Sequence, residues 1–161
     1  MTAVVSLGTN LGDRMGRLRA AIEVLGRQVG VLAVSPVYET APVGVVDQPA
    51  FLNAVAVLDS DDPEVVFGAA QAAEQAQGRV RAVRWGPRTL DVDVIAVDSI
   101  VTDDPRLTLP HPRAHERAFV LVPWLAVDPS ASLPGHGPVE ALLAALPPQD
   151  VRRIADPLPL P

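Results

Sequence analysis

Residues 90–97 read LDVDVIAV, and their first half alternates between apolar and acidic side chains. Successive side chains of a β-strand point to opposite faces of a sheet. Leu90, Val92 and Val94 therefore share one face, and Asp91 and Asp93 share the other. We expect a strand in a sheet whose apolar face packs against helices and whose other face is left for extra segments and for function.

The segments before this strand extend the pattern. Residues 3–7 (AVVSL), 31–39 (VLAVSPVYE) and 51–58 (FLNAVAVL) are typical of strands, and Pro36 makes the second an edge strand or a bulged one. Apolar spacing over 13–29, with Asp13 as N-cap, and the pair Asp62-Pro63 predict two helices, the second ending near Gln77. The order β-α-β-β-α-β is ferredoxin-like: an α+β fold with an antiparallel sheet and both helices on one face.

The C-terminal part is expected to add segments to this unit. Residues 107–112 look extended, 118–125 (AFVLVPWL) look like another strand or a buried segment, and 138–146 form a short helix. The Pro-rich tail, 150–161, is predicted to be peripheral. A chain of 161 residues has the length of one domain, so we expect a single domain over 1–161.

The composition excludes several classes of protein. Cysteine is absent, which excludes disulfides, thiolate metal sites and a cysteine nucleophile. All 13 basic residues are arginine, so a Walker-type phosphate loop and Schiff-base chemistry are excluded. The net charge of −6 argues against a nucleic-acid partner. Without a basic leader or a long apolar run we expect no membrane partner and a cytoplasmic protein.

An arginine cluster precedes the strand that carries the two aspartates. Residues 79–88 read RVRAVRWGPR, with four arginines and no acid. Two carboxylates side by side favour a divalent cation such as Mg²⁺, and guanidinium groups clamp phosphate oxygens. The combination indicates a site for a metal–polyphosphate complex. Taken alone, the Asp pair could also be a solvated strand face and the arginines a solvated loop.

A longer match identifies the family that the sequence resembles. Residues 84–95 (RWGPRTLDVDVI) closely resemble the signature of the 6-hydroxymethyl-7,8-dihydropterin pyrophosphokinase family. Further segments match in the same order and spacing over about residues 1–130: 8–12 (GTNLG), 38–44 (YETAPVG), 47–54 (DQPAFLNA), 77–81 (QGRVR) and 106–111 (RLTLPH). The resemblance implies a ferredoxin-like fold, in agreement with the predicted order.

The resemblance also implies a reaction and the residues that carry it. The family moves the two terminal phosphates of ATP to the hydroxymethyl oxygen of the dihydropterin and releases AMP. Asp91 and Asp93 match the pair that binds two Mg²⁺ ions, and Arg79 and Arg88 match catalytic arginines. Positions at or near the nucleotide are Gln71, Glu74, Arg81, Arg84, Arg88, Val94, Arg106, Thr108, His111, Pro112 and Arg117. Positions at the pterin are Phe51 and Phe119, which sandwich the ring, Thr40 and Asn53, which read its polar edge, the backbone of Ala41 and Val43, and Trp85 in a closing loop.

The sequence departs from the family pattern at a few positions. Phe51 stands where many relatives have tyrosine, Ala41 where proline is common, and Pro112 where an aromatic residue is common. The arginine loop is one residue shorter than in some relatives. We expect a monomer whose partners are ATP and the pterin. The alternatives are another Mg²⁺-dependent phosphoryl or nucleotidyl transferase, and a non-catalytic ferredoxin-like binding module.

Overall fold

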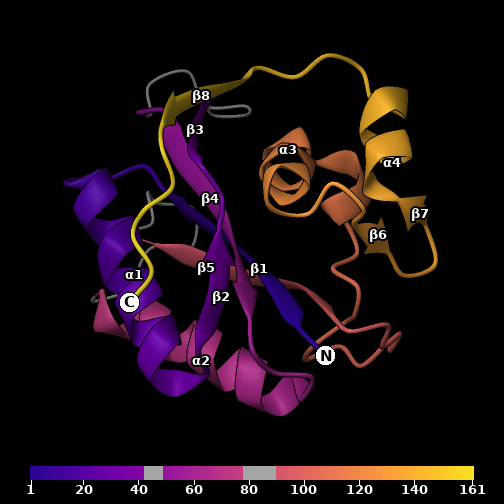
Figure 1. Cartoon of the computed structure of the whole chain (residues 1–161), viewed down its shortest axis with the longest axis horizontal. Coiled ribbons are helices and arrows are strands. Elements are labelled where there is room, and N and C mark those ends of the chain that lie inside the picture. Colours follow the sequence, from indigo (N-terminus) through magenta and orange to yellow (C-terminus); the bar gives the residue numbers. More distant parts are fainter. Residues whose placement is uncertain (42–48, 78–89) are drawn as a thin grey trace.

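An antiparallel sheet runs through the computed structural model, which describes residues 1–41, 49–77 and 90–161, and helices lie on both of its faces (Figure 1). Its strands are β1 (Ala3–Thr9), β2 (Val31–Val34), β3 (Val37–Thr40), β4 (Phe51–Leu58), β5 (Asp91–Val97) and β8 (Val151–Ala155). They lie in the order β5-β1-β4-β3-β8, and β2 pairs with the other end of β4. The predicted ferredoxin-like order is confirmed, with β8 as an addition.

The predicted strand over 31–39 is divided at Ser35 and Pro36. Ser35 N donates to Val55 O at 2.9 Å, and Ser35 Oγ accepts from Val55 N at 2.8 Å. Its side chain thus supplies a partner to β4 where the ladder is interrupted, next to a proline that has no N–H to donate. Both alternatives hold in part: β2 pairs with β4 alone and shifts register between Val31 and Ala33, whereas β3 lies between β4 and β8.

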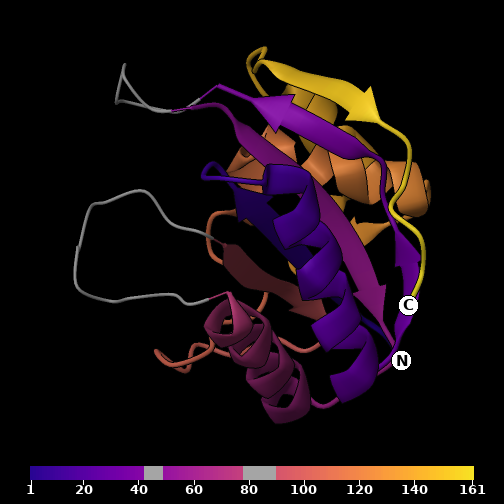
Figure 2. The same cartoon turned by 90° about the vertical axis from the view of Figure 1, so that its left-hand side faces the viewer.

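Helices α1 (Arg14–Gln28) and α2 (Pro63–Ala76) lie side by side on one face of the sheet (Figure 2). Both begin as predicted: Asp13 accepts from Gly16 N at 3.0 Å, and Asp62 accepts from Glu64 N at 3.0 Å. Their apolar stripes pack on the sheet through Leu18, Ala21, Ile22, Leu25, Val66, Ala69, Ala70 and Ala73. Within the described ranges, no helix combines the length and apolar character that crossing a membrane requires.

The other face of the sheet is covered by the segments after β5. These are the 3₁₀ helix η1 (Ala114–Glu116), α3 (Ala118–Val127), the hairpin of β6 (Ser132–Leu133) and β7 (Gly137–Pro138), and α4 (Val139–Ala145). The predicted short helix over 138–146 is confirmed. Of the two expectations for 118–125, the strand is wrong and the buried segment is confirmed: the residues form a largely buried helix. Its side chains are apolar all round, so no period distinguishes helix from strand, and Pro123 lies inside it.

The C-terminal tail is part of the sheet and of the core, which corrects the expectation of a peripheral segment. Strand β8 pairs with β3 along its length. Beyond β8, Leu158 is buried in the cluster formed by α1, α2 and the sheet. Pro161 packs against Gly26 of α1, where an added Cβ would lie 2.4 Å from Pro161 Cγ. The sequence does not predict these contacts, because a Pro-rich segment is not typical of a β-strand. The single-domain expectation stays a prediction.

Candidate active site

Strands β1, β4 and β5 bring the predicted polar residues into two rows of the sheet, two residues apart. Gly8 of β1 pairs with Asn53 on one side and with Asp91 on the other. Two residues along β1, Ser6 pairs with Val55 and with Asp93. Val55 packs under α3, whereas Val92 and Val94 pack under α1 and α2. By strand alternation Asn53, Asp91 and Asp93 are therefore directed to the α3 face, as the sequence predicts.

A pocket of about 270 Å³ lies between β5, α2 and the segment after β5. Its volume is close to the lower end of the roughly 300–1,000 Å³ range of small-molecule sites. It is lined by Phe67, Val92, Asp93, Val94, Pro105, Arg106, Leu107, Thr108, His111 and Pro112. The structure thus brings together six residues predicted to act at the nucleotide or the metal. Apolar walls with Arg106, His111 and Asp93 at one site suit a ligand that has both a ring and an anionic part.

His111 enters this pocket as a neutral imidazole. Its Nδ1 accepts a hydrogen bond from Arg113 N at 3.2 Å, which assigns the proton to Nε2. Burial lowers the pKa of His111 below 6.5, Asp93 opposes that shift, and Arg117 and Arg113 lower the pKa further. His111 N also donates to Ile95 O at 2.8 Å, which ties the residue to β5. The side chain can therefore donate a hydrogen bond from Nε2 to a phosphate oxygen near neutral pH.

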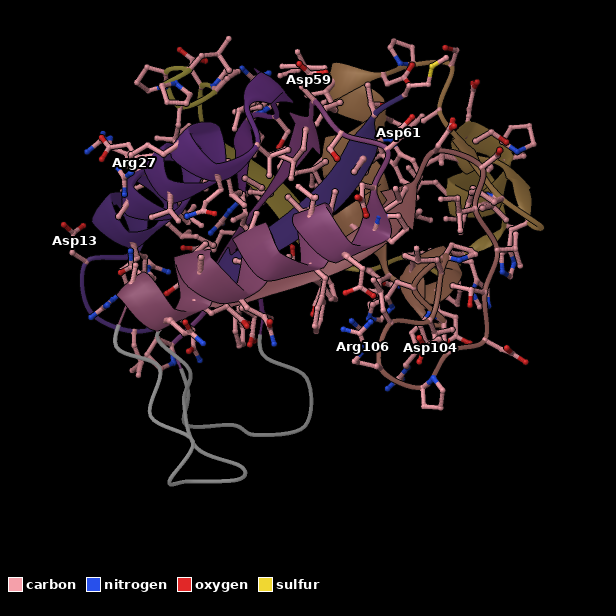
Figure 3. The ribbon with its side chains drawn as sticks, turned by 90° about the horizontal axis from the view of Figure 1, so that it is seen from below. Asp13, Arg27, Asp59, Asp61, Asp104 and Arg106 are labelled. Atoms are coloured by element: carbon pink, nitrogen blue, oxygen red, sulfur yellow. The ribbon has the colours of Figure 1, made fainter. Side chains whose placement is uncertain are left out.

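Arg106 is paired with an acidic residue of α2. Its guanidinium binds the Glu64 carboxylate in the first turn of α2, and it lies over the Phe67 ring at 5.7 Å from the centroid. Figure 3 shows Arg106 and Asp104 on the segment that follows β5, next to α2. Asp104 accepts from Arg106 N at 3.0 Å and shapes this turn. A phosphate at Arg106 therefore has to compete with Glu64.

Two predicted nucleotide residues lie on α2. Glu74 Oε2 accepts from Val92 N at 3.1 Å, so its carboxylate ties α2 to β5 between the two aspartates. Gln71 lies three residues earlier and is half-buried. Spacing of three or four residues places Phe67, Gln71 and Glu74 along one side of the helix. Phe67, which the sequence reasoning missed, could have been found from this spacing; Pro105 and Leu107 flank the predicted Arg106 directly.

The predicted pterin side begins with a buried pair. Thr40 Oγ1 donates to Asn53 Oδ1 at 2.7 Å, and both residues are buried. This bond fixes the amide so that its NH₂ group is left to donate. A Cβ added at Gly8 would lie 3.0 Å from Asn53 Nδ2 and 4.0 Å from the Phe51 ring. Glycine at this position therefore lets the Asn53 amide lie close to β1.

Phe51 and Phe119 come from the sheet and from the layer above it. Phe51 begins β4, and Phe119 lies in the first turn of α3, which packs on β4 and β3. Both rings are half-buried. The Arg117 guanidinium lies over the Phe119 ring at 5.5 Å from the centroid. Partly exposed rings on facing elements are suited to stacking on a flat heterocycle.

Part of the predicted site lies outside the described residues. These predictions are Val43, Arg79, Arg81, Arg84, Trp85 and Arg88. Ala41, the last described residue before 42–48, is exposed. Their roles stay predictions.

Asp91 and Asp93 fit a hard divalent cation. Both are half-buried at the start of β5, and each offers carboxylate oxygens. Mg²⁺ binds through one or two carboxylates and takes its other ligands from phosphates and water. Among the residues that the structure describes, no group of three or more His, Cys, Asp or Glu side chains is arranged to hold a metal. This donor set therefore suits an ion completed by a bound phosphate, and Asp91 and Asp93 are the residues to hold it.

The fold and the site define a class of protein: a ferredoxin-like α+β protein with a pocket suited to a ligand that has a ring and an anionic part. Two carboxylates and an amide lie beside this pocket on one face of the sheet. Residues 4–129 match the family 7,8-dihydro-6-hydroxymethylpterin-pyrophosphokinase (HPPK). The chain is 49% identical over 165 residues to a 2-amino-4-hydroxy-6-hydroxymethyldihydropteridine pyrophosphokinase of Mycobacterium tuberculosis, covering 93% of this chain and 87% of the relative. It is 42% identical to the enzyme of the same name from Pseudomonas aeruginosa, covering 93% and 94%.

A solved structure is similar in fold. The HPPK-DHPS wild type of Plasmodium falciparum with pteroate superposes with a TM-score of 0.70 at 13% identity. The match covers 89% of this chain and 44% of the solved one, so this chain spans less than half of that protein. The chain belongs to the 7,8-dihydro-6-hydroxymethylpterin-pyrophosphokinase family, and it is an enzyme, a pyrophosphokinase.

Proposed function

We propose that this enzyme transfers pyrophosphate from ATP to the hydroxymethyl group of 6-hydroxymethyl-7,8-dihydropterin, with Mg²⁺, and releases AMP. The product would enter the synthesis of tetrahydrofolate, in the cytoplasm. The observation that carries the proposal is the pocket beside β5: its walls hold Arg106, Thr108, His111 and Asp93 together. An adenine ring fits its apolar part, and the phosphates would extend from Arg106 and His111 toward Asp93.

The reaction requires positioning and charge neutralisation more than a covalent group on the enzyme. The hydroxymethyl oxygen forms a bond to the β-phosphorus, the bond from that phosphorus to the bridging α–β oxygen breaks, and AMP leaves. The hydroxyl proton passes to solvent. Mg²⁺ held by Asp91 and Asp93 would neutralise phosphate charge. His111 would donate from Nε2 to a phosphate oxygen. Arg106 would release the Glu64 carboxylate and bind a second phosphate oxygen.

The row of residues across the sheet supports the placement of the pterin. The Asn53 amide, held by Thr40, would donate to the ring, and Phe51 and Phe119 would stack on its two sides. Asn53 and Asp91 are separated by Gly8 alone in their row. A pterin read by Asn53 would thus direct its hydroxymethyl arm toward the carboxylates. Arg79 and Arg88 would complete the charge stabilisation.

The experiment that tests this proposal follows the nucleotide products. Purified protein is incubated with ATP, Mg²⁺ and 6-hydroxymethyl-7,8-dihydropterin, and AMP and ADP are separated by chromatography. AMP formed only when pterin and metal are both present is the expected result. ADP in place of AMP would contradict pyrophosphoryl transfer and favour another phosphoryl transferase. ATP binding without turnover would favour a binding module.

A further inference from the structure

Residues 149–152, which lead from α4 into β8, contact both sides of the proposed pterin site. Gln149 reaches the start of α3: its Oε1 accepts from Ala118 N at 3.0 Å, and its Nε2 donates to Glu116 O at 3.0 Å. Three residues later, Arg152 of β8 reaches the sheet: its guanidinium donates to Glu39 Oε1 at 2.6 Å. Neither residue lines the nucleotide pocket.

Gln149 binds the backbone at the start of α3, next to Phe119. Helix α3 begins at Ala118, and its N-cap residue, Arg117, makes no capping hydrogen bond with its own side chain. The first N–H groups of a helix have no partner within the helix. Gln149 supplies a partner for one of them and at the same time holds the preceding turn through Glu116 O. The position of Phe119, one residue further on, is therefore set from the C-terminal segment.

Arg152 acts on the opposite wall through Glu39. Glu39 precedes Thr40, and its other oxygen accepts from Arg14 Nη1 at 3.4 Å. The same Arg14 nitrogen donates to Ala50 O at 2.8 Å. Thr40 and Phe51, the residues that follow Glu39 and Ala50, pair with each other across β3 and β4. The two arginines lower the pKa of Glu39, Arg152 most, so the carboxylate stays charged near neutral pH.

We propose that residues 149–152 form a brace that sets the separation between the α3 wall and the sheet wall of the pterin site, with Gln149 and Arg152 as positioning residues. This inference rests on the proposed function. A flat ring stacked between two phenylalanines needs two contacts of about 3.5–4 Å each, so the separation of Phe51 and Phe119 has to be held closely. One short segment bound at both walls is suited to hold it.

The variants Gln149→Met and Arg152→Met remove one end of the brace each and keep side-chain bulk. Arg153→Met is the matched control, because Arg153 is the next residue of β8 and its guanidinium donates to the exposed Asp156 carboxylate at 2.9 Å. The dissociation constant of the dihydropterin is measured by calorimetry with Mg²⁺ and a non-hydrolysable ATP analogue present. Steady-state KM values for both substrates and thermal melting accompany it.

We expect each brace variant to weaken pterin binding roughly three- to tenfold, the size of one lost hydrogen bond, and to leave the KM for ATP within about twofold. The double variant should lose little more pterin affinity than the single variant with the larger loss, because releasing either end already releases the brace. Arg152→Lys and Gln149→Glu, which keep a cation and an acceptor respectively, should recover part of the affinity. Arg153→Met should bind pterin as the wild type does.

The brace would be overturned by unchanged pterin affinity in both variants, by equal losses for ATP and pterin, or by the same loss in Arg153→Met. A fall in melting temperature with unchanged pterin affinity would show a structural role only and would also overturn it. These outcomes are separate from failure of the proposed function, which is a wild-type protein that forms no pterin-dependent AMP. If a methionine variant does not fold, the pterin affinities of Gln149→Glu and Arg152→Lys are compared with that of the wild type instead. A loss confined to pterin supports the brace, and unchanged affinity overturns it.

Discussion

Asn53 and Asp91 lie in one row of the sheet, on either side of Gly8. Neighbouring strands are about 4.8 Å apart, so the two backbones are separated by about 10 Å. A residue that can read a heterocycle and a residue that can hold a metal thus face the same layer at a fixed spacing. The sheet, rather than a loop, sets the distance between the two halves of the proposed site.

Gly8 is predicted to be needed for the position of Asn53. In Gly8→Ala the new methyl group would lie 3.0 Å from Asn53 Nδ2 and would displace the amide. We expect pterin affinity to fall about tenfold or more, since forcing an extra methyl group into a packed site costs roughly 1–3 kcal/mol. The measurement is a pterin titration by calorimetry.

The control for this change is Gly68→Ala. Gly68 lies inside α2, and a Cβ added there meets no atom within 4 Å. Alanine should stabilise the helix by about 0.5–1 kcal/mol and leave pterin affinity unchanged. Equal pterin affinity in Gly8→Ala and wild type would contradict the close approach of Asn53 to β1.

Asp91 and Asp93 are predicted to act in turnover and not in folding. Asp91→Ala and Asp93→Ala should each lower the rate of AMP formation by at least about 10²-fold, the scale of one lost electrostatic contact in a transition state. Both residues are half-buried on a strand face, so folding should persist. Mg²⁺ titration of the rate, with circular dichroism of the variants, checks both statements. Asp103→Ala, an exposed acid further along the chain, should behave as wild type.

Glu64 is predicted to compete with ATP for Arg106. Glu64→Gln removes the carboxylate that binds the Arg106 guanidinium. The KM for ATP should then fall, by no more than a few-fold, because an exposed ion pair contributes little. Arg106→Gln should raise it. A rise of the KM in Glu64→Gln would mean that Glu64 positions Arg106 instead of occupying it.

Much of the fold could be predicted because most elements carry a period or a cap. The α1 and α2 stripes, their N-caps at Asp13 and Asp62, and the alternation of β4 and β5 all have local causes. Helix α3 could not be predicted, because a wholly apolar segment has no period. Strand β8, with its exposed Arg152 and Arg153, forms through its pairing with β3. No feature of the local sequence predicts this pairing.

The candidate site, too, is predictable from the sequence only in part. Alternation placed Asp91 and Asp93 on one face, and the family resemblance brought in Arg106, Thr108 and His111, which the structure gathers around one pocket. The pairing of Arg106 with Glu64 joins residues 42 positions apart and depends on tertiary packing. The contacts of Gln149 and Arg152 cannot be predicted from local sequence for the same reason, since their partners lie 31 and 113 positions away.

His111 is predicted to stay neutral under conditions where an exposed histidine is half-protonated. Burial lowers its pKa below 6.5, with Arg117 and Arg113 acting in the same direction. In the metal-free protein, the His111 ring proton followed by NMR should therefore titrate below pH 6.5. Asp93→Asn should lower the pKa further, because the Asp93 carboxylate raises it in the wild type. The His111→Gln spectrum assigns the signal.

The same shift fixes the sign of a stability effect. As pH falls through 6.5, the unfolded chain binds a proton at His111 before the folded chain does, so the free energy of unfolding decreases. Above that pH both states are neutral at this position and the contribution is constant. Urea unfolding at pH 7.5 and pH 5.5 should show a smaller loss for His111→Gln than for wild type. An equal loss in the two proteins, or a His111 titration above pH 6.5, would contradict a half-buried neutral imidazole at the edge of the proposed nucleotide pocket.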